Sequence, residues 1–260
     1  MAGSGFTLAA SAVAGGCGGL LSGLFGVGGG VVLIPLLGLS LGLNQHQAQG
    51  ATLAAMLLPN GLPAVLHLRS RGIRIPWALV GLLTAGFLPA VWLGARLANG
   101  IPDLPLRWGF AAFLLFLALR SFRQPPELAP TGPAPARNPA WGFTGLGIGA
   151  LGGLASGLLG IGGGLLIIPL LVWRLGLTQH EAQAASLTFM LAPIGLPGVL
   201  VYARSGGGLP WLVMAGVAVG FLAGAYAGAR VATRLRGPRL RQGFALFLAA
   251  MALLLVMRDF

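Results

Sequence analysis

Residues 22–37 of the chain read SGLFGVGGGVVLIPLL, and residues 156–171 read SGLLGIGGGLLIIPLL. Eleven of these 16 positions are identical, and the two copies are offset by 134 residues. The same offset relates Gln45–Pro63 to Gln179–Pro197 without a gap. The chain therefore consists of two homologous halves, and each half interrupts an apolar stretch with a run of glycines.

The composition indicates an integral membrane protein built of α-helices. Of the 260 residues, 56% are hydrophobic and only 8% are charged, whereas soluble domains carry about 25% charged residues. No basic residue precedes the first apolar stretch. A secretory signal would carry a positive segment there, so we expect this stretch to be retained.

The charge of the chain suits a membrane better than a nucleic acid. All 16 basic residues are arginines, and the formal net charge is +12. In an apolar chain, loop arginines set the orientation in the bilayer, so we expect a lipid bilayer as partner and no nucleic acid. The sequence has no lysine for a Schiff base or a Walker-A site, no paired nucleophile and base within the apolar stretches, and no metal-ligand spacing. We expect neither an enzyme nor a cofactor. A homo-oligomer is compatible with the sequence, which does not specify one.

The apolar stretches divide the chain into a first membrane repeat (1–122), a Pro-rich linker (123–140) and a second membrane repeat (141–260). Each repeat contains about five predicted helical segments. These are 7–25, 30–43, 48–68, 76–98 and 106–121, and then 141–159, 164–177, 182–203, 210–232 and 240–257. The stretch 30–43 has 14 residues, fewer than the roughly 20 that cross a bilayer. We therefore expect a bent pair of helices around each glycine run.

The arginines predict that the two repeats are inverted relative to each other. If the chain turns back at the glycines, each repeat has an odd number of segments. The arginine-rich loops at 69–74 and 230–241 then lie on the same side as the linker. The positive-inside rule makes that side cytoplasmic and places both termini outside. If the repeats were parallel, the arginines would be divided nearly evenly between the two sides of the membrane.

The glycine runs are the main candidates for a binding site. A helix break in hydrocarbon must be buried in protein or line a cavity. A helix that starts after such a run directs free N–H groups and a partial positive charge at the break. Two such starts facing each other form a pocket for a small anion. The candidate residues are Gly28, Gly29, Gly30, Gly162, Gly163 and Gly164. The alternative is that these glycines only allow close helix packing.

The motif G-[VI]-G-G-G-x-x-x-[IL]-P-L-L, followed by G-L-x-Q-H-x-A-x-x-A-[ST]-L, occurs once in each half. This pattern resembles the TauE/SafE family of sulfite and sulfonate permeases. The resemblance implies a transporter in the cytoplasmic (inner) membrane that moves a small sulfur-containing anion such as sulfite, thiosulfate or an organosulfonate. Family members commonly read Gly-Thr-Ser-Leu in the second motif, whereas this chain has Ala51 and Ala185 in place of the Thr.

Each polar side chain within the apolar stretches has two interpretations. Thr52 and Ser186 occupy matched positions, and either donate to a bound oxyanion or bond to the carbonyl one turn earlier. Gln49 and Gln183 also match, and either donate an amide to the anion or cap a helix start. The candidates without a counterpart are Asn60, Thr188 and Cys17, for which helix–helix bonding or core packing is the alternative.

These features predict a secondary transporter whose halves rock about a central anion to give alternating access. No acidic residue lies at the centre of a predicted span, so the sequence indicates no carboxylate proton relay. Two alternatives stay open. One is a channel or permease for another small anion such as a carboxylate, and the other is a non-transporting membrane scaffold.

Overall fold

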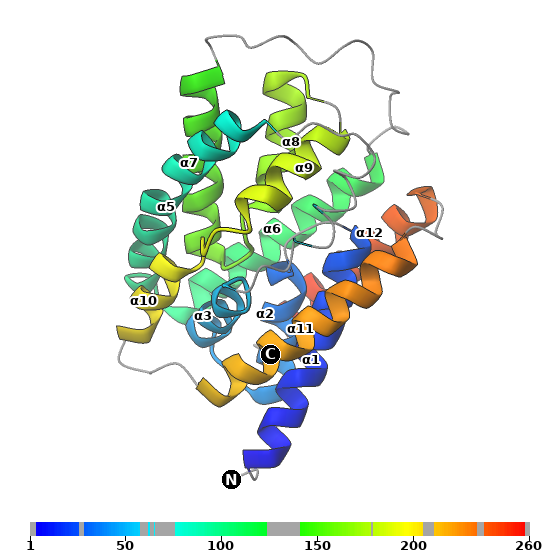
Figure 1. Cartoon of the computed structure of the whole chain (residues 1–260). Helices are drawn as coiled ribbons and strands as arrows, with labels where there is room; N and C mark the ends of the chain where they lie inside the picture. The colour runs from blue at the N-terminus through cyan, green and yellow to red at the C-terminus, as the bar shows by residue number, and fades with distance from the viewer. Residues whose placement is uncertain are drawn as a thin grey trace.

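The computed structural model describes residues 4–25, 29–57, 62, 65, 76–123, 141–177, 179–204, 211–232 and 237–257. Every regular element in these ranges is an α-helix, which confirms the predicted all-α fold (Figure 1). The helices of the first half are α1 (Ser4–Phe25), α2 (Gly30–Leu41), α3 (Gln45–Ala55), α5 (Trp77–Asn99) and α6 (Asp103–Arg123). Those of the second half are α7 (Trp141–Leu159), α8 (Gly164–Leu175), α9 (Gln179–Phe189), α10 (Leu196–Arg204), α11 (Trp211–Ala232) and α12 (Gly237–Met257).

The prediction of one continuous segment over 182–203 is wrong. The chain leaves α9 at Phe189 and re-enters a helix at Leu196. Pro193 lies between the two helices and cannot supply a helical N–H. Gly195 follows, and its Cα packs so closely on Leu53 that a Cβ would overlap the Leu53 carbonyl oxygen. The second half therefore has six helices in its described residues rather than about five.

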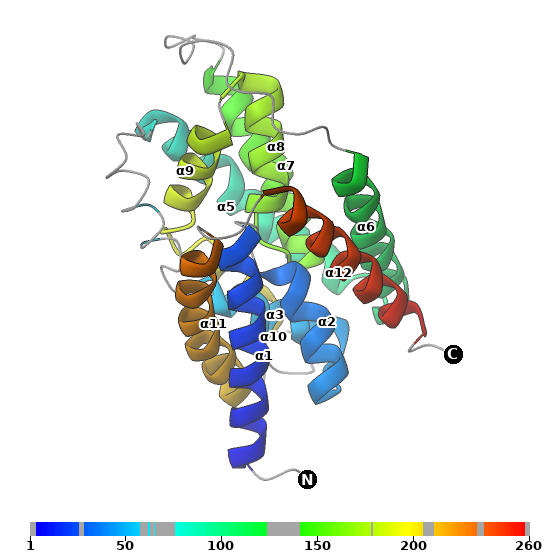
Figure 2. The same cartoon turned by 90° about the vertical axis from the view of Figure 1, so that its right-hand side faces the viewer.

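Among the described residues, four helices are long and apolar enough to cross a membrane, and they form two pairs. The four are α1, α5, α7 and α11. The most extensive helix contacts in the described structure join α1 to α11 and α5 to α7 (Figure 2). Under the 134-residue offset, α1 corresponds to α7 and α5 corresponds to α11. Each pair therefore combines one helix from each half, and the two pairs consist of corresponding helices.

Glycines allow the helices of each pair to touch along their backbones. A Cβ on Gly220 of α11 would overlap the Ala12 carbonyl oxygen of α1. A Cβ on Gly86 of α5 would overlap the Leu146 carbonyl oxygen of α7. The 134-residue offset relates Ala12 to Leu146 and Gly86 to Gly220, so the two contacts are equivalent. These glycines serve close packing, because small residues let membrane helices approach each other.

The shorter helices lie between these pairs and position the glycine runs. α2 packs on α1 and α3, and α8 packs on α7 and α9. Both short helices end at a glycine in the left-handed conformation, Gly42 with φ 66° and Gly176 with φ 64°, which is the usual way to close a helix C-terminus. The last helices of the halves, α6 and α12, pack on each other (Figure 2).

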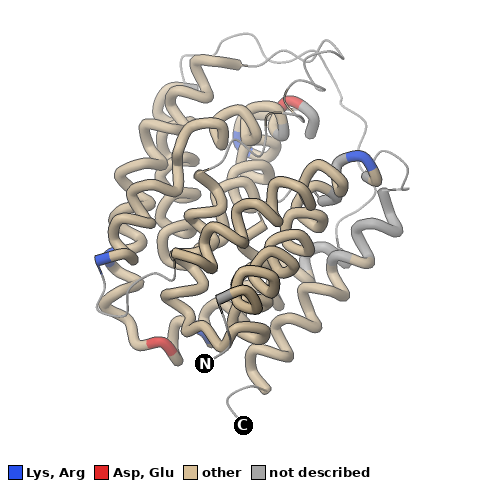
Figure 3. The backbone as a smooth tube through the Cα atoms, turned by 60° about the horizontal axis from the view of Figure 1, so that its bottom comes forward, with Lys and Arg blue, Asp and Glu red and all other residues tan. Residues whose placement is uncertain are grey.

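The charged side chains described in the structure lie near helix ends, where a membrane protein meets water (Figure 3). Arg96, Arg174, Arg204 and Arg230 belong to the last turns of their helices. Asp103 begins α6 and pairs with Arg107 one turn later at 2.6 Å. Glu181 lies in the first turn of α9. This distribution leaves the middle of the four long helices free of described charge.

Candidate functional site

The start of α2 lies directly against the second glycine run. A Cβ on Gly30, the first residue of α2, would lie 2.6 Å from the Ile161 Cα and would overlap the Gly160 carbonyl oxygen. Gly160 and Gly162 have φ of 68° and 72°, values that favour glycine. These positive φ angles turn the chain from α7 into α8. Gly28 falls outside the described residues, so the contact is defined by Gly30 from the first run.

Both helix starts carry amide N–H groups for which the described residues supply no acceptor. In α2 the N–H groups of Val32 and Leu33 donate to the Gly29 carbonyl at 3.0 and 2.8 Å. The N–H groups of Gly30 and Val31 come before them and have no acceptor among the described residues. Val31 is 0% exposed. A helix start normally obtains its acceptors from capping side chains or water, but the N-cap Gly29 has no side chain to supply one.

The start of α8 repeats this arrangement. The N–H groups of Leu166 and Ile167 donate to the Gly163 carbonyl at 3.2 and 3.0 Å. The N–H groups of Gly164 and Leu165 have no acceptor within the described part of the chain. Both residues are buried. Each helix also carries partial positive charge at this end, which is the electrostatic environment that a negatively charged group prefers.

Aromatic rings cover both helix starts. A Cβ on Gly163 would lie 2.5 Å from Cε2 of Phe87, and one on Gly29 would overlap the ring of Phe221. Phe87 and Phe221 are related by the 134-residue offset, and each comes from the half that does not contain the glycine it covers. Phe87 also contacts Phe189, with 5.2 Å between ring centroids. The structure therefore encloses the helix starts with apolar side chains rather than exposing them to a wide opening.

Two matched methionines complete the enclosure next to the second glycine run. A Cβ on Gly162 would lie 2.6 Å from Cε of Met56 and 3.5 Å from Cε of Met190. Met56 and Met190 are related by the 134-residue offset. The unbranched methionine side chain adapts readily to different packing.

Two of the hydroxyl candidates donate to carbonyls of their own helices. Thr52 is buried and donates to the Ala48 carbonyl at 2.8 Å, and Thr188 donates to the Ala184 carbonyl at 2.6 Å. For Thr52 this bond is the expected intrahelical alternative, whereas Thr188 bonds within its own helix and not to a neighbouring helix. Ligand binding by either residue stays a prediction. Ser186 is also buried, with 1% of the residue exposed. Asn60 lies outside the described residues.

Gln49 follows neither expected interpretation. Its Nε2 donates to the Leu158 carbonyl at 2.9 Å, and its Oε1 accepts from the Tyr202 hydroxyl at 2.8 Å. The side chain thus links α3 to α7 and α10 beside the second glycine run. The helix start is capped instead by Asn44 and Gln47, which form a capping box. The side chain of the matching Gln183 lies outside the described set.

Comparison with known proteins places the chain in a transporter family. The family model described as "Sulfite exporter TauE/SafE" matches residues 11–255. The chain belongs to the TauE/SafE family. Its relatives include a "Probable membrane transporter protein" of Xylella fastidiosa, 29% identical over 94% of this chain and 93% of the relative. A protein of the same description from Haemophilus influenzae is 27% identical over 90% of this chain and 92% of the relative. No solved structure matches.

These matches confirm the family and the general class of the protein. It is a membrane transporter of the TauE/SafE family, with four helices able to span a membrane. The relative YdhB of Bacillus subtilis, 26% identical over 82% of this chain and 85% of its own length, is likewise described only as a "Probable membrane transporter protein".

Tyr202 is a buried polar residue of this TauE/SafE member that sequence reasoning missed. Its hydroxyl lies 2.8 Å from Oε1 of Gln49 and 2.7 Å from the Gly157 carbonyl oxygen, and the residue is 2% exposed. Its counterpart under the offset is Leu68. Comparison of the halves therefore gave no signal for a polar contact at this position.

Replacing Tyr202 with phenylalanine is expected to lower the thermal unfolding temperature of the purified protein. The change leaves the buried Oε1 of Gln49 without its donor, which costs about 1–3 kcal/mol. Tyr226→Phe is the matched control, because Tyr226 is 49% exposed and surface changes usually alter stability by less than about 0.5 kcal/mol. Equal unfolding temperatures for the two variants would contradict the structural role of Tyr202.

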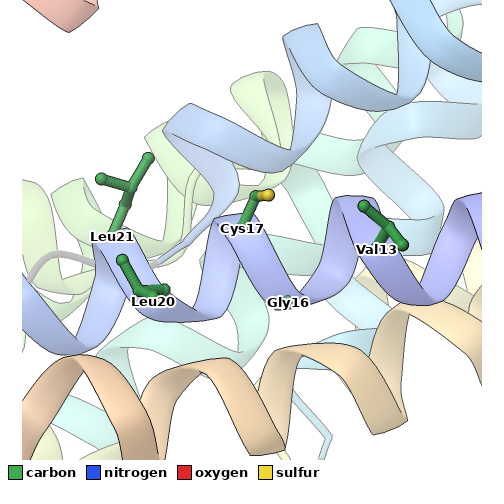
Figure 4. A pocket seen from close by; sticks show the side chains of 5 residues that line it. All are labelled: Val13, Gly16, Cys17, Leu20 and Leu21. Carbon is green, nitrogen blue, oxygen red and sulfur yellow. The ribbon is translucent and has the colours of Figure 1, made fainter.

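Cys17 lies away from the helix starts. It is exposed on α1 and lines an open apolar depression with Val13, Gly16, Leu20 and Leu21 of the same helix (Figure 4). The structure does not bring this thiol together with the glycines of the candidate site. In contrast, Ser156 on α7 is 0% exposed and belongs to the repeated motif, although sequence reasoning did not select it.

Proposed function

We propose that this TauE/SafE member is a secondary transporter that moves a small sulfur-containing anion, namely sulfite, thiosulfate or an organosulfonate, across the cytoplasmic membrane. One observation carries the proposal. The start of α2 lies against Gly160 and Ile161, next to the start of α8, and both starts keep buried N–H groups without acceptors among the described residues. An oxyanion is the chemical complement of such donors.

The proposed site binds its anion without a fixed opposite charge. The described arginines lie near helix ends (Figure 3), and the donors at the helix starts are neutral amides. Binding by amides and a helix dipole gives less affinity than an ion pair with a buried arginine. A transporter gains from this weaker binding, since its substrate has to leave on the other side.

Alternating access is supported by the reciprocal packing of the two halves. In Figure 1, α1 begins at the lower end of the molecule and α7 begins at the upper end, as inverted repeats require. Because α1 packs on α11 and α7 on α5, we propose that these pairs, rather than the sequence halves, move as rigid units. Phe221 then uncovers α2 on one side while Phe87 still covers α8, and the reverse occurs on the other side.

The orientation of the chain is part of the proposal. The positive-inside rule applied to the arginine-rich loops and the linker puts both termini outside the cytoplasmic membrane. A tag at either terminus is then accessible to an impermeant reagent in intact cells.

Uptake into proteoliposomes tests the proposed function. Vesicles containing the purified protein are expected to take up ³⁵S-labelled sulfite, thiosulfate or methanesulfonate with saturation, and unlabelled substrate should compete. Proton and sodium gradients imposed separately identify any coupling ion. Protein-free vesicles are the control. Saturable uptake of acetate but of no sulfur anion would reject the proposed substrate class, non-saturable flux would indicate a channel, and the absence of any anion flux would reject transport.

A further inference from the structure

We infer that Ser156 is a substrate-binding residue: its hydroxyl donates to the bound oxyanion together with the N–H groups of Gly164 and Leu165 at the start of α8. This inference rests on the proposed function and adds to it a side chain that contacts the anion. It also makes α8 the principal binding helix of the two.

Ser156 has an unused hydroxyl in a fully buried position. The residue is 0% exposed, and its Oγ has no hydrogen-bond partner among the described residues. Five other helical hydroxyls in the described structure behave differently, because each donates to a carbonyl three or four residues earlier in its own helix. These are Ser11, Ser40, Thr52, Thr84 and Thr188. Since a buried hydroxyl without a partner destabilises a fold, an unused one at this position indicates a partner from outside the chain.

The packing of α7 on α8 places Ser156 beside the start of α8. A Cβ on Gly152 of α7 would lie 2.7 Å from Cγ1 and 3.0 Å from Cδ1 of Ile167. A Cβ on Gly163 would lie 2.9 Å from the same Cδ1 of Ile167. Ser156 follows Gly152 by one helical turn, and Gly163 precedes Ile167 by one turn, so the hairpin of α7 and α8 brings Ser156 to the level of Gly163.

The other face of α7 points elsewhere. Gly153 lies one residue past Gly152 on the helix, and its Cβ position falls 2.9 Å from the Phe87 Cα of α5. Gly157 continues that face, with a Cβ position 2.6 Å from the Ala95 nitrogen. Ser156 and Gly152 therefore share the face toward α8, which directs the hydroxyl at the helix start and away from α5.

Three neutral donors match the head group of a sulfur oxyanion. Sulfite and a sulfonate each present three oxygens, and each oxygen accepts a hydrogen bond from one of Ser156, Gly164 and Leu165. A carboxylate presents two oxygens and occupies two of these donors. Loss of the hydroxyl is therefore expected to weaken binding of sulfite or a sulfonate more than binding of a carboxylate.

The Ser156→Ala variant tests the inference through affinity and stability together. Hydrogen bonds to charged groups are among the stronger ones in proteins, so KM for the transported sulfur anion is expected to rise about tenfold or more. The unfolding temperature without anion should stay equal or rise, because the change removes an unsatisfied buried hydroxyl. The control is Ser11→Ala, since Ser11 is also buried but donates to the Leu8 carbonyl at 2.9 Å. Its KM should not change.

A binding measurement separates failure of this inference from failure of the proposed function. The rise in unfolding temperature on adding sulfite, thiosulfate, methanesulfonate or acetate is recorded for the wild type and for Ser156→Ala. Anion stabilisation that is lost or weakened in the variant supports the inference, even if the preferred anion is a carboxylate. Equal stabilisation, or an unchanged KM, overturns the inference and leaves transport intact. No stabilisation of the wild type by any of these anions overturns both.

Discussion

Replacing Gly30 with alanine is expected to abolish anion uptake into proteoliposomes. The new Cβ would lie 2.6 Å from the Ile161 Cα and would overlap the Gly160 carbonyl oxygen. Both neighbours are backbone atoms, so they cannot move aside as a flexible side chain can. The start of α2 then moves away from the second glycine run, and the two sets of N–H donors no longer face a common anion. Overpacking of this kind costs about 1–3 kcal/mol, so folded protein should still be recovered.

The matched control for this variant is Gly81→Ala on α5. Gly81 has nothing within 4 Å of its Cβ position, and alanine is the better helix former by about 1 kcal/mol. Its uptake rate should equal that of the wild type. Gly29→Leu and Gly163→Leu provide a second test, because each leucine meets the phenylalanine ring that covers the glycine. Undiminished uptake by Gly30→Ala or by both leucine variants would contradict the anion site.

Replacing Gly220 with valine is expected to prevent assembly of the folded bundle. Gly220 lies in the backbone contact between α11 and α1, where a Cβ would overlap the Ala12 carbonyl oxygen. A branched side chain there forces the two long helices apart and removes contacts along their whole length. We expect a loss of about 3 kcal/mol or more, seen as loss of monodisperse protein in size-exclusion chromatography and a lower unfolding temperature.

The duplication provides a second test of whether close glycine packing holds each pair of long helices together. Gly86→Val places valine at the corresponding contact between α5 and α7 and should be as damaging as Gly220→Val. Gly109→Val on α6 is the control, because Gly109 is exposed and has nothing within 4 Å of its Cβ position. If Gly220→Val and Gly109→Val give equal yields and unfolding temperatures, close glycine packing does not hold the pairs together.

The sequence predicted the helix breaks because their cause is local. Glycine runs that end near Gly30 and Gly164 lower helix propensity over several consecutive residues, and α2 and α8 begin at those glycines. The pairing of α1 with α11 could not be predicted in this way. Small residues spaced by four along a helix indicate that the helix packs closely, but they do not specify which helix is the partner.

The roles of individual side chains depended on contacts between distant segments. Gln49 and Tyr202 are 153 residues apart along the chain, and no spacing rule connects them. The break between α9 and α10 lies within residues 182–203, which are predominantly apolar and therefore predict one continuous segment. A proline such as Pro193 does not by itself predict a break, because membrane helices tolerate proline. Ser156 could have been selected from the sequence, since serine also occupies the matched position 22 in the first half. Its unused hydroxyl became visible only in the packed structure.

Anomalous scattering from bound selenite, a heavier analogue of sulfite, is the most direct measurement of the central claim. The crystal should contain the Cys17→Ser variant, so that selenite meets no thiol. We predict a selenium peak between the start of α2 and the start of α8, with oxygens within hydrogen-bonding distance of the N–H groups of Gly30 or Gly164. A peak confined to the depression beside residue 17, or no peak at a selenite concentration that saturates binding, would contradict the account.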